Sequence, residues 1–207
     1  MPSDVSAAVL APFRDLIQKH SGLQVPDYRL PELKRVLDEL LTTTGLQSLD
    51  ALLQRLSGPI GLQDRQRLIH QMTVGETYFF RDGAQFKALE QEVLPLLIRQ
   101  RRRVGSLRIW SAACSTGEEP YSLAILVHRL LRRELDGWRI VILGTDINHD
   151  ALSRARQAQY RPWSLRATSD PIRGMYFQPI GEMWELRPEI RRMVTFQALN
   201  LVKDPYP

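Results

Sequence analysis

The 207-residue chain has few of the residues that mark several common kinds of functional site. A single cysteine, Cys114, excludes an internal disulfide and favours a reducing compartment. The four histidines are scattered without metal-ligand spacing, which argues against a metal site. No segment reaches about 20 uninterrupted apolar residues, and the N-terminus lacks the long apolar core of a signal peptide. We therefore expect a soluble cytoplasmic protein without a resident metal ion.

The chain does have a surplus of arginine and enough apolar residues for a core. The net charge is +5 and the sequence pI is about 9.6. This balance favours acidic partners without identifying them, so nucleic acid, an acidic protein and a membrane surface all stay open. With 43% hydrophobic residues, the chain can bury one large core or two small ones.

Residues 107–122 are the most informative stretch. A short apolar strand is followed by six small residues up to Gly117, and then by an apolar-periodic segment with Pro120 in its first turn. That order predicts a strand, a tight loop and a helix start. Small residues let the backbone approach a ligand, and a helix N-terminus leaves N–H groups free. We interpret the loop as part of a cofactor site.

A second strand is predicted over residues 139–144, and Asp146 follows its end. An acid there typically accepts hydrogen bonds from ribose hydroxyls, and strand, helix and strand together predict a doubly wound α/β sheet. The loop has only Gly117 where a pyrophosphate binder carries three glycines, so a dinucleotide is disfavoured. A nucleoside cofactor without phosphate fits better. S-adenosylmethionine is such a cofactor, and its sulfonium favours nearby carboxylates.

The first seventy residues predict a small helical bundle. Apolar residues recur at helical spacing over residues 5–19, with Asp4 as cap, and again after Pro31, after Ser48 and over residues 62–72. Cations on the second and fourth of these helices could form a basic recognition face. A solvated helix surface is the simpler interpretation.

The segment that follows fits neither a helix nor a strand, because residues 78–80 are consecutive aromatics between polar residues. Such aromatics are typically buried in a hinge between modules. Residues 83–103 predict a long helix, in which Pro95 should cause a kink or a break and the terminal arginines complement the helix dipole.

The rest of the chain continues the α/β pattern with one interruption. A helix capped by Asn148 is predicted over residues 148–158, and a strand over residues 193–199. Between them, residues 160–192 are rich in proline and aromatics. There we expect a small insertion of short antiparallel strands.

Four motifs together resemble the CheR-type chemotaxis methyltransferases, with the resemblance covering residues 8–201. The motifs are TYFFRD at residues 77–82, WSAACSTGEEPYS at residues 110–122, TDIN at residues 145–148 and NL at residues 200–201. The second motif is long and highly specific. The order and spacing of all four strengthen the resemblance.

The resemblance implies methyl transfer from S-adenosyl-L-methionine to glutamate side chains of chemoreceptors, with S-adenosyl-L-homocysteine as product. It implies an α/β protein with an all-α helical domain and hinge over residues 1–82. A Rossmann-like methyltransferase domain over residues 83–207 would carry an inserted β-subdomain at about 160–192. The implied partner is the cytoplasmic domain of a chemoreceptor, with no nucleic acid and no membrane insertion. Because the family continues past the NL motif into further strands, we expect the N-terminal portion of a longer protein, with an incomplete methyltransferase domain.

Carried over by position, the resemblance implies that Arg81 orients the substrate carboxylate as a catalytic residue. Gly75 stands where the family often has asparagine, which removes one side-chain contact to the cofactor. Simpler roles stay open, since Asp146 could cap the next helix, Glu119 could be an acid favoured by the helix dipole, and Arg81 could pair with Asp82 or Glu76. The implied cofactor-binding residues are Thr77, Arg81, Ala113, Gly117, Glu119, Asp146, Asn200 and Leu201.

The expected chemistry needs few catalytic groups. A glutamate carboxylate, with a pKa near about 4.3, is already ionised at pH 7 and needs no general base. Two other functions stay open. One is a non-catalytic signalling module that binds the cofactor or the receptor, and the other is nucleic-acid methylation, which only the basic charge suggests.

Overall fold

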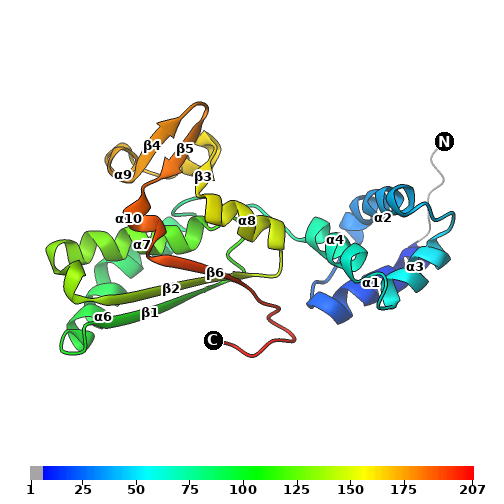
Figure 1. Ribbon diagram of the computed structural model, residues 1–207, viewed down its shortest axis with the longest axis horizontal. Coiled ribbons are helices and arrows are strands. Elements are labelled where there is room, and N and C mark those ends of the chain that lie inside the picture. The colour runs from blue at the N-terminus through cyan, green and yellow to red at the C-terminus, as the bar shows by residue number, and fades with distance from the viewer. Residues whose placement is uncertain (1–6) are drawn as a thin grey trace. The chain divides into compact units, whose positions relative to one another are not determined.

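The computed structural model describes residues 7–207, so the expected cap Asp4 lies outside the described residues. The chain divides into two compact units. One contains the residues up to Val74 together with Asn200–Tyr206, and the other contains Gly75–Leu199 with Pro207. The first is helical, and the second is built on a parallel sheet (Figure 1).

The helical unit confirms the predicted bundle. The Ser48 hydroxyl caps the third helix by accepting a hydrogen bond from the Ala51 N–H at 3.2 Å, as predicted. Gly45 ends the second helix in the left-handed conformation that glycine tolerates best. The elements are α1 (Ala7–Ser21), the short 3-10 helix η1 (Asp27–Arg29), α2 (Leu30–Thr44), α3 (Leu49–Ser57) and α4 (Leu62–Met72).

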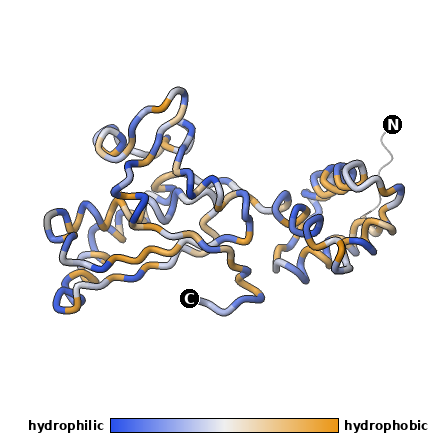
Figure 2. Tube along the Cα trace, viewed as in Figure 1, coloured by the Kyte–Doolittle hydropathy of each residue, from blue (hydrophilic) through white to orange (hydrophobic). Residues whose placement is uncertain are grey.

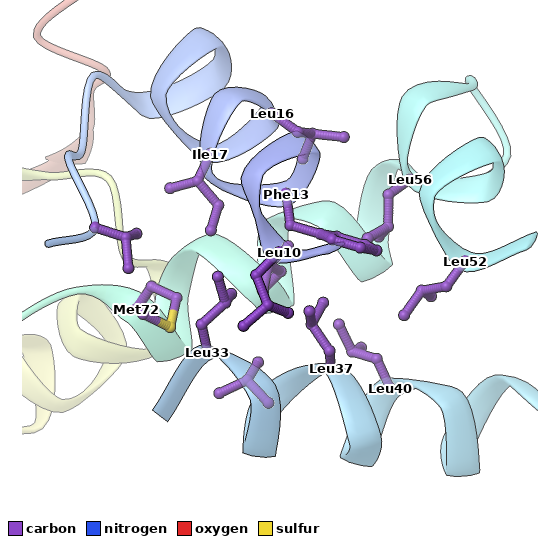
Figure 3. Close-up of a cluster of buried hydrophobic side chains, with 13 residues drawn as sticks. Leu10, Phe13, Leu16, Ile17, Leu33, Leu37, Leu40, Leu52, Leu56 and Met72 are labelled. Carbon is purple, nitrogen blue, oxygen red and sulfur yellow. The ribbon is translucent and has the colours of Figure 1, made fainter. Parts of the chain in front are cut away.

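The core of this unit is apolar and draws on all four α-helices. Figure 3 shows Phe13 and Ile17 of α1 pointing toward leucines of α2 and α3, with Met72 of α4 at one side. Burying each such side chain stabilises the fold by about 1.5–3 kcal/mol. The C-terminal segment Asn200–Tyr206 also packs against this unit. Val202 lies so close to Gly22 that a Cβ atom there would be 2.3 Å from Cγ2 of Val202.

The cations of α2 are paired along the helix. Lys34 contacts Asp38 at 2.6 Å, and Arg35 pairs with Glu39, both one turn further on. Their charges are therefore largely balanced locally, which supports the simpler interpretation of this surface as a solvated face.

The second unit has three parallel strands in the order β1 (Ser106–Ala112), β2 (Arg139–Asp146) and β6 (Val194–Ala198) (Figure 1). All three strands lie where the sequence predicts them. The helices α7 (Glu118–Leu131) and α8 (His149–Gln157) connect and cover them, and Asn148 caps α8 as predicted. The carboxyl ends of β1 and β2 therefore lie side by side.

Helix α7 packs on one face of this sheet. Leu107 and Ile109 of β1 and Ile142 of β2 cluster there with α7. The opposite face carries Arg108 and Trp110, both exposed.

The predicted long helix before β1 is continuous but irregular. It consists of α5 (Gly83–Ala88), the π-helical turn η2 (Leu89–Val93) and α6 (Leu94–Arg101). Pro95 has no N–H to donate, and its ring would clash with the carbonyl group of Gln91 four residues earlier. The wider π turn, which contains Gln91, accommodates the proline without breaking the helix.

The insertion is partly antiparallel, as predicted, and partly helical. β3 (Gln159–Tyr160), β5 (Met183–Leu186) and β4 (Phe177–Ile180) form a second small sheet in that order. The helical part was not predicted. Pro162, Pro171 and Pro188 stand in the first turn of helices, where a missing N–H costs nothing, whereas Pro179 lies in β4. The helical pieces are η4 (Pro162–Leu165), α9 (Asp170–Tyr176) and α10 (Pro188–Arg191), and a further 3-10 segment, η3 (Arg132–Gly137), precedes β2.

Figure 2 shows hydrophobic residues concentrated along β2 and along one side of the N-terminal helices. Hydropathy therefore follows the two cores. None of the helices in the described part of the chain is long and apolar enough to cross a lipid bilayer.

Candidate cofactor site at the carboxyl edge of the parallel sheet

The loop between β1 and α7 has an unusual backbone. Ala113, Ser115 and Gly117 have φ angles of 56°, 48° and 90°, so three alternate residues are left-handed. For the two residues that are not glycine this costs about 1–3 kcal/mol each. The loop is held by hydrogen bonds to β2, since the Cys114 N–H donates to the carbonyl oxygen of Thr145 at 2.9 Å. Strain maintained in this way is typical of functional loops.

Asp146 fastens the same loop through its side chain. Its Oδ2 accepts a hydrogen bond from the Ser115 N–H at 2.8 Å, and its Oδ1 accepts one from the Asn148 N–H at 2.8 Å. Asn148, not Asp146, is the cap of α8. Each carboxylate oxygen can accept more than one hydrogen bond, so the group keeps capacity for ligand hydroxyls. Asp146 is 8% exposed, which leaves it at the edge of the surface.

Gly117 is required by packing at the loop's end. A Cβ atom there would lie 2.9 Å from Cβ of Ala155 and 3.0 Å from the ring of Phe196. Gly144 on β2 is restricted by the same ring, at 2.8 Å. The two glycines let Phe196 pack under the loop, where it also meets the Tyr121 ring edge-on at 5.4 Å. A cofactor contact by Gly117 stays a prediction.

Ala113 in this loop and Glu119 in the first turn of α7 are both exposed. The buried Ser111 hydroxyl of β1 donates to Oε1 of Glu119 at 2.7 Å, which aims the carboxylate toward the strand end. Glu119 lies in the first turn of α7, where the helix dipole favours an acid. An oriented and exposed carboxylate can still bind a cationic ligand group. Ser111 was not predicted, because a serine within a strand gives no signal in the sequence.

Residues 75–82, the connecting segment, contact the same loop. The Ser115 hydroxyl donates to the carbonyl oxygen of Gly75 at 3.3 Å. Phe79 is fully buried between the rings of Tyr160 and Phe177, as expected for the central aromatic of this segment. Its N–H donates to the carbonyl oxygen of Ser164 at 2.9 Å. The connecting segment is thereby fixed to both the loop and the insertion.

Thr77 and Arg81 are carried by this connecting segment. Thr77 is half-buried, and Arg81 is exposed. Nη1 of Arg81 donates to the backbone carbonyl oxygen of Glu76 at 2.7 Å, rather than to a carboxylate. The Glu76 carboxylate instead pairs with Arg166 at 3.4 Å, and Asp82 caps α5. Much of the Arg81 guanidinium is therefore available to a ligand.

Glu118, directly before Glu119, is the acid that sequence reasoning passed over. It is 2% exposed, and it accepts hydrogen bonds from the hydroxyls of Thr116 at 2.6 Å and Ser164 at 3.1 Å. Burial raises the pKa of Glu118, while these hydrogen bonds and the Arg166 charge act in the opposite direction. In the sequence, only the pair of adjacent acids in the motif could have indicated a role for Glu118.

Cys114 lines the loop as a neutral thiol. Burial, followed by the nearby Asp146, Glu119 and Glu118 carboxylates, raises its pKa to about 12. The thiolate form is negligible near neutral pH, so the residue is not an activated nucleophile. Cys114 therefore serves as one of the small residues of the loop.

Asn200 and Leu201 belong to the helical unit and not to the unit that carries the other candidates. The Asn200 side chain donates to the carbonyl oxygen of His20 at 2.7 Å. Leu199, one residue earlier, donates its N–H to the carbonyl oxygen of Asp146 at 3.0 Å. The chain thus passes Asp146 immediately before Asn200. The cofactor roles of Asn200 and Leu201 stay predictions.

The residues present fit a nucleoside cofactor with a cationic centre. The loop offers a backbone of small residues, Asp146 offers oxygens at a strand end, and Glu119 adds an exposed carboxylate. Among the described residues no group of three or more His, Cys, Asp or Glu side chains could hold a metal ion.

Comparison with known proteins agrees with this geometry. The family model described as CheR methyltransferase, SAM binding domain, matches residues 75–207. Chemotaxis protein methyltransferase 1 of Pseudomonas aeruginosa is 34% identical over 198 residues, which cover 94% of this chain and 71% of that protein. The chemotaxis protein methyltransferase of Listeria monocytogenes is 31% identical over 195 residues, covering 94% and 71%. That of Escherichia coli is 30% identical over 195 residues, covering 92% and 65%.

Proposed function

Because the chain belongs to the CheR methyltransferase family, and so uses S-adenosyl-L-methionine as its cofactor, we propose that it methylates glutamate side chains of chemotaxis receptors. The product would be a glutamate methyl ester. The observation that carries the proposal is the Asp146 carboxylate, which fastens a strained loop of small residues at the end of β2.

Four residues of the α/β unit would hold the cofactor in this proposal. Asp146 would accept hydrogen bonds from the ribose hydroxyls, as acids at this strand end commonly do. Glu119 would bind the positively charged amino group, and exposed Ala113 would let the ligand approach the backbone. Thr77 on the connecting segment would contact the amino-acid end. Asn200 and Leu201 are proposed to contact the adenine.

The bound cofactor would supply an electrophilic methyl group on a sulfonium, which an ionised carboxylate can accept by displacement to leave a neutral thioether. Arg81, with its exposed guanidinium, would orient that carboxylate through charge-assisted hydrogen bonds. No proton needs to be removed, so the main task of these residues is alignment. Correct alignment can lower a barrier by about 7–11 kcal/mol.

The binding step is tested by calorimetric titration of the chain with S-adenosylhomocysteine. Asp146→Ala should weaken binding roughly tenfold or more, because it removes an ionised hydrogen-bond acceptor from the site. Asp150→Ala is a matched control, since Asp150 is an exposed acid in the first turn of the next helix. Equal affinities for the two variants would remove Asp146 from the site.

The chemical step is tested with radiolabelled methyl groups and a receptor cytoplasmic domain. A glutamate methyl ester releases methanol in mild base, whereas methylated nucleic-acid bases and amines do not. We expect base-labile label on the receptor and its loss in Arg81→Ala. Cofactor binding with no transfer to receptor would instead indicate a non-catalytic binding module. Label on nucleic acid would indicate nucleic-acid methylation.

A further inference from the structure

We propose that Glu118 is a positioning residue, whose buried carboxylate fixes the connecting segment and with it Thr77 and Arg81. The catalytic part of this inference rests on the proposed function. The structural part concerns only hydrogen bonds within the chain, so it can be tested without substrate.

A carboxylate that is 2% exposed needs partners, because burying an unpaired charge is costly. Both oxygens of Glu118 have one. Oε2 accepts from the Thr116 hydroxyl of the loop, and Oε1 accepts from the Ser164 hydroxyl of η4 in the insertion. The side chain thus joins the loop to the insertion through Thr116 and Ser164, which are 48 residues apart in the sequence.

The bond to Ser164 extends to the connecting segment. The same serine accepts the Phe79 N–H at its backbone carbonyl oxygen, at 2.9 Å. Fixing Ser164 therefore fixes Phe79. The adjacent Tyr160 hydroxyl donates to the carbonyl oxygen of Thr116 at 2.9 Å, which closes the link between the insertion and the loop.

A second route runs through the backbone of Glu118. Its carbonyl oxygen accepts the Ser122 hydroxyl at 2.7 Å, and the Ser122 oxygen accepts the Phe80 N–H at 3.1 Å. Phe80 has a φ of 58°, a conformation that needs such external support. The two routes end on Phe79 and Phe80, which lie with Tyr78 between Thr77 and Arg81.

The residues that Glu118 fixes are close in sequence to the two candidate site residues of the connecting segment. Arg81 directly follows Phe80, and Thr77 lies two residues before Phe79. Arg166 adds a further tie, because its guanidinium stacks 3.6 Å from the centre of the Tyr78 ring. Since a displacement of about 1 Å can cost about a hundredfold in rate, loosening this segment should affect turnover.

The structural part is tested by amide hydrogen exchange at Phe79 and Phe80 in the chain without ligand. Ser164→Ala keeps the carbonyl oxygen that Phe79 uses and removes only the link to Glu118. We expect about tenfold faster exchange at Phe79 in this variant and in Glu118→Ala, whereas exchange at Phe80 should stay slow, because the backbone carbonyl oxygen of residue 118 and the Ser122 hydroxyl remain in both variants. Ser57→Ala is the control, because that hydroxyl caps a carbonyl group within the helical unit. Unchanged exchange in Ser164→Ala would overturn the proposal, whether or not Glu118→Ala folds.

The catalytic part separates positioning from simple stabilisation. Glu118→Ala should lower kcat about tenfold or more and leave the affinity for S-adenosylhomocysteine within about threefold, because Asp146 and Glu119 are untouched. Glu118→Gln, which keeps two polar atoms that the rotating hydroxyls can bond, should restore most of the kcat and the slow exchange. Faster exchange with an unchanged kcat would refute the positioning role alone. Absence of methyl transfer by the unmodified chain would refute the proposed function and leave the exchange result standing.

Discussion

The two units bury different kinds of residue. Within the described part of the chain, every fully buried side chain of the helical unit is apolar. Among residues 7–207, all buried polar side chains lie in the α/β unit, and so do all residues other than glycine with positive φ. The buried polar residues are Ser111, Glu118, Ser122, Thr145, Asp146 and Thr168.

This difference separates a unit built for packing from one built to hold a site. Apolar burial stabilises without requiring directed partners. Buried acids and left-handed residues cost free energy and persist only where their surroundings fix them. In the α/β unit most of them gather around the loop of residues 112–118. Substitutions should therefore act on stability in the helical bundle of residues 7–72, and on both stability and ligand binding in the α/β unit.

The largest expected effect is in the helical core. Phe13→Ala should destabilise this unit by about 3–5 kcal/mol, because it leaves a cavity among side chains from all four α-helices. Hydrogen exchange in residues 7–72 would measure it, since two units need not unfold in one transition. Val9→Ala, 46% exposed on the same helix, should change stability by about 0.5 kcal/mol or less. Similar losses in both variants would contradict the assignment of the core.

Gly117→Ala should combine a loss of stability with a loss of binding. A left-handed alanine costs about 1–2 kcal/mol, and contact with Ala155 and Phe196 adds overpacking strain. We expect a loss of about 2 kcal/mol or more in thermal or urea unfolding, with weaker S-adenosylhomocysteine binding. Gly83→Ala is the control, because nothing lies within 4 Å of its added Cβ atom. A fully stable Gly117→Ala variant would show that the loop can rearrange.

The sequence predicted regular elements well, because their signals are local. Ser48 and Asn148 occur where caps were expected, and β6 follows an alternating pattern. The insertion was harder, since prolines such as Pro171 are compatible with strand ends as well as with helix starts. At Pro95 a kink or a break was predicted, and the π turn that keeps the helix continuous was not, because a π turn leaves no trace in the sequence pattern.

The candidate site was predictable to the level of its motifs and no further. Glu118 and Glu119 are equivalent in a sequence pattern, yet adjacent residues on a helix point about 100° apart. One is buried against the insertion and the other faces out. The role of Glu118 depends on Ser164, which is distant in the sequence. The role of Glu119 depends on Ser111, a strand serine that no sequence pattern marks as functional. Ligand contacts by the predicted residues stay predictions.

A moderate, pH-dependent effect is expected at Glu118. Its folded pKa is raised, chiefly by burial, so protonation favours the folded state. The charged and titratable groups facing it are Arg166, Tyr160 and Cys114. Relative to Glu118→Gln, the parent chain should lose stability as pH rises from about 4.5 through the raised pKa, and then level off. Urea unfolding across pH 4–8 measures this, with exposed Glu92→Gln as the flat control. A constant difference for Glu118→Gln would contradict the raised pKa.

The smallest effect is expected on the surface of α2, where Arg35 pairs with Glu39 one turn further along the helix. Both side chains are largely exposed, so the pair is worth about 0.3–0.5 kcal/mol and is screened by salt. Arg35→Ala should therefore shift the urea midpoint only slightly, and the shift should shrink further at high ionic strength.

The same variant measures what this surface contributes to recognition. If α2 is only a solvated face, binding of a receptor cytoplasmic domain should be unchanged, whereas a clear loss of binding without loss of stability would make α2 a docking surface and break the contrast between the units.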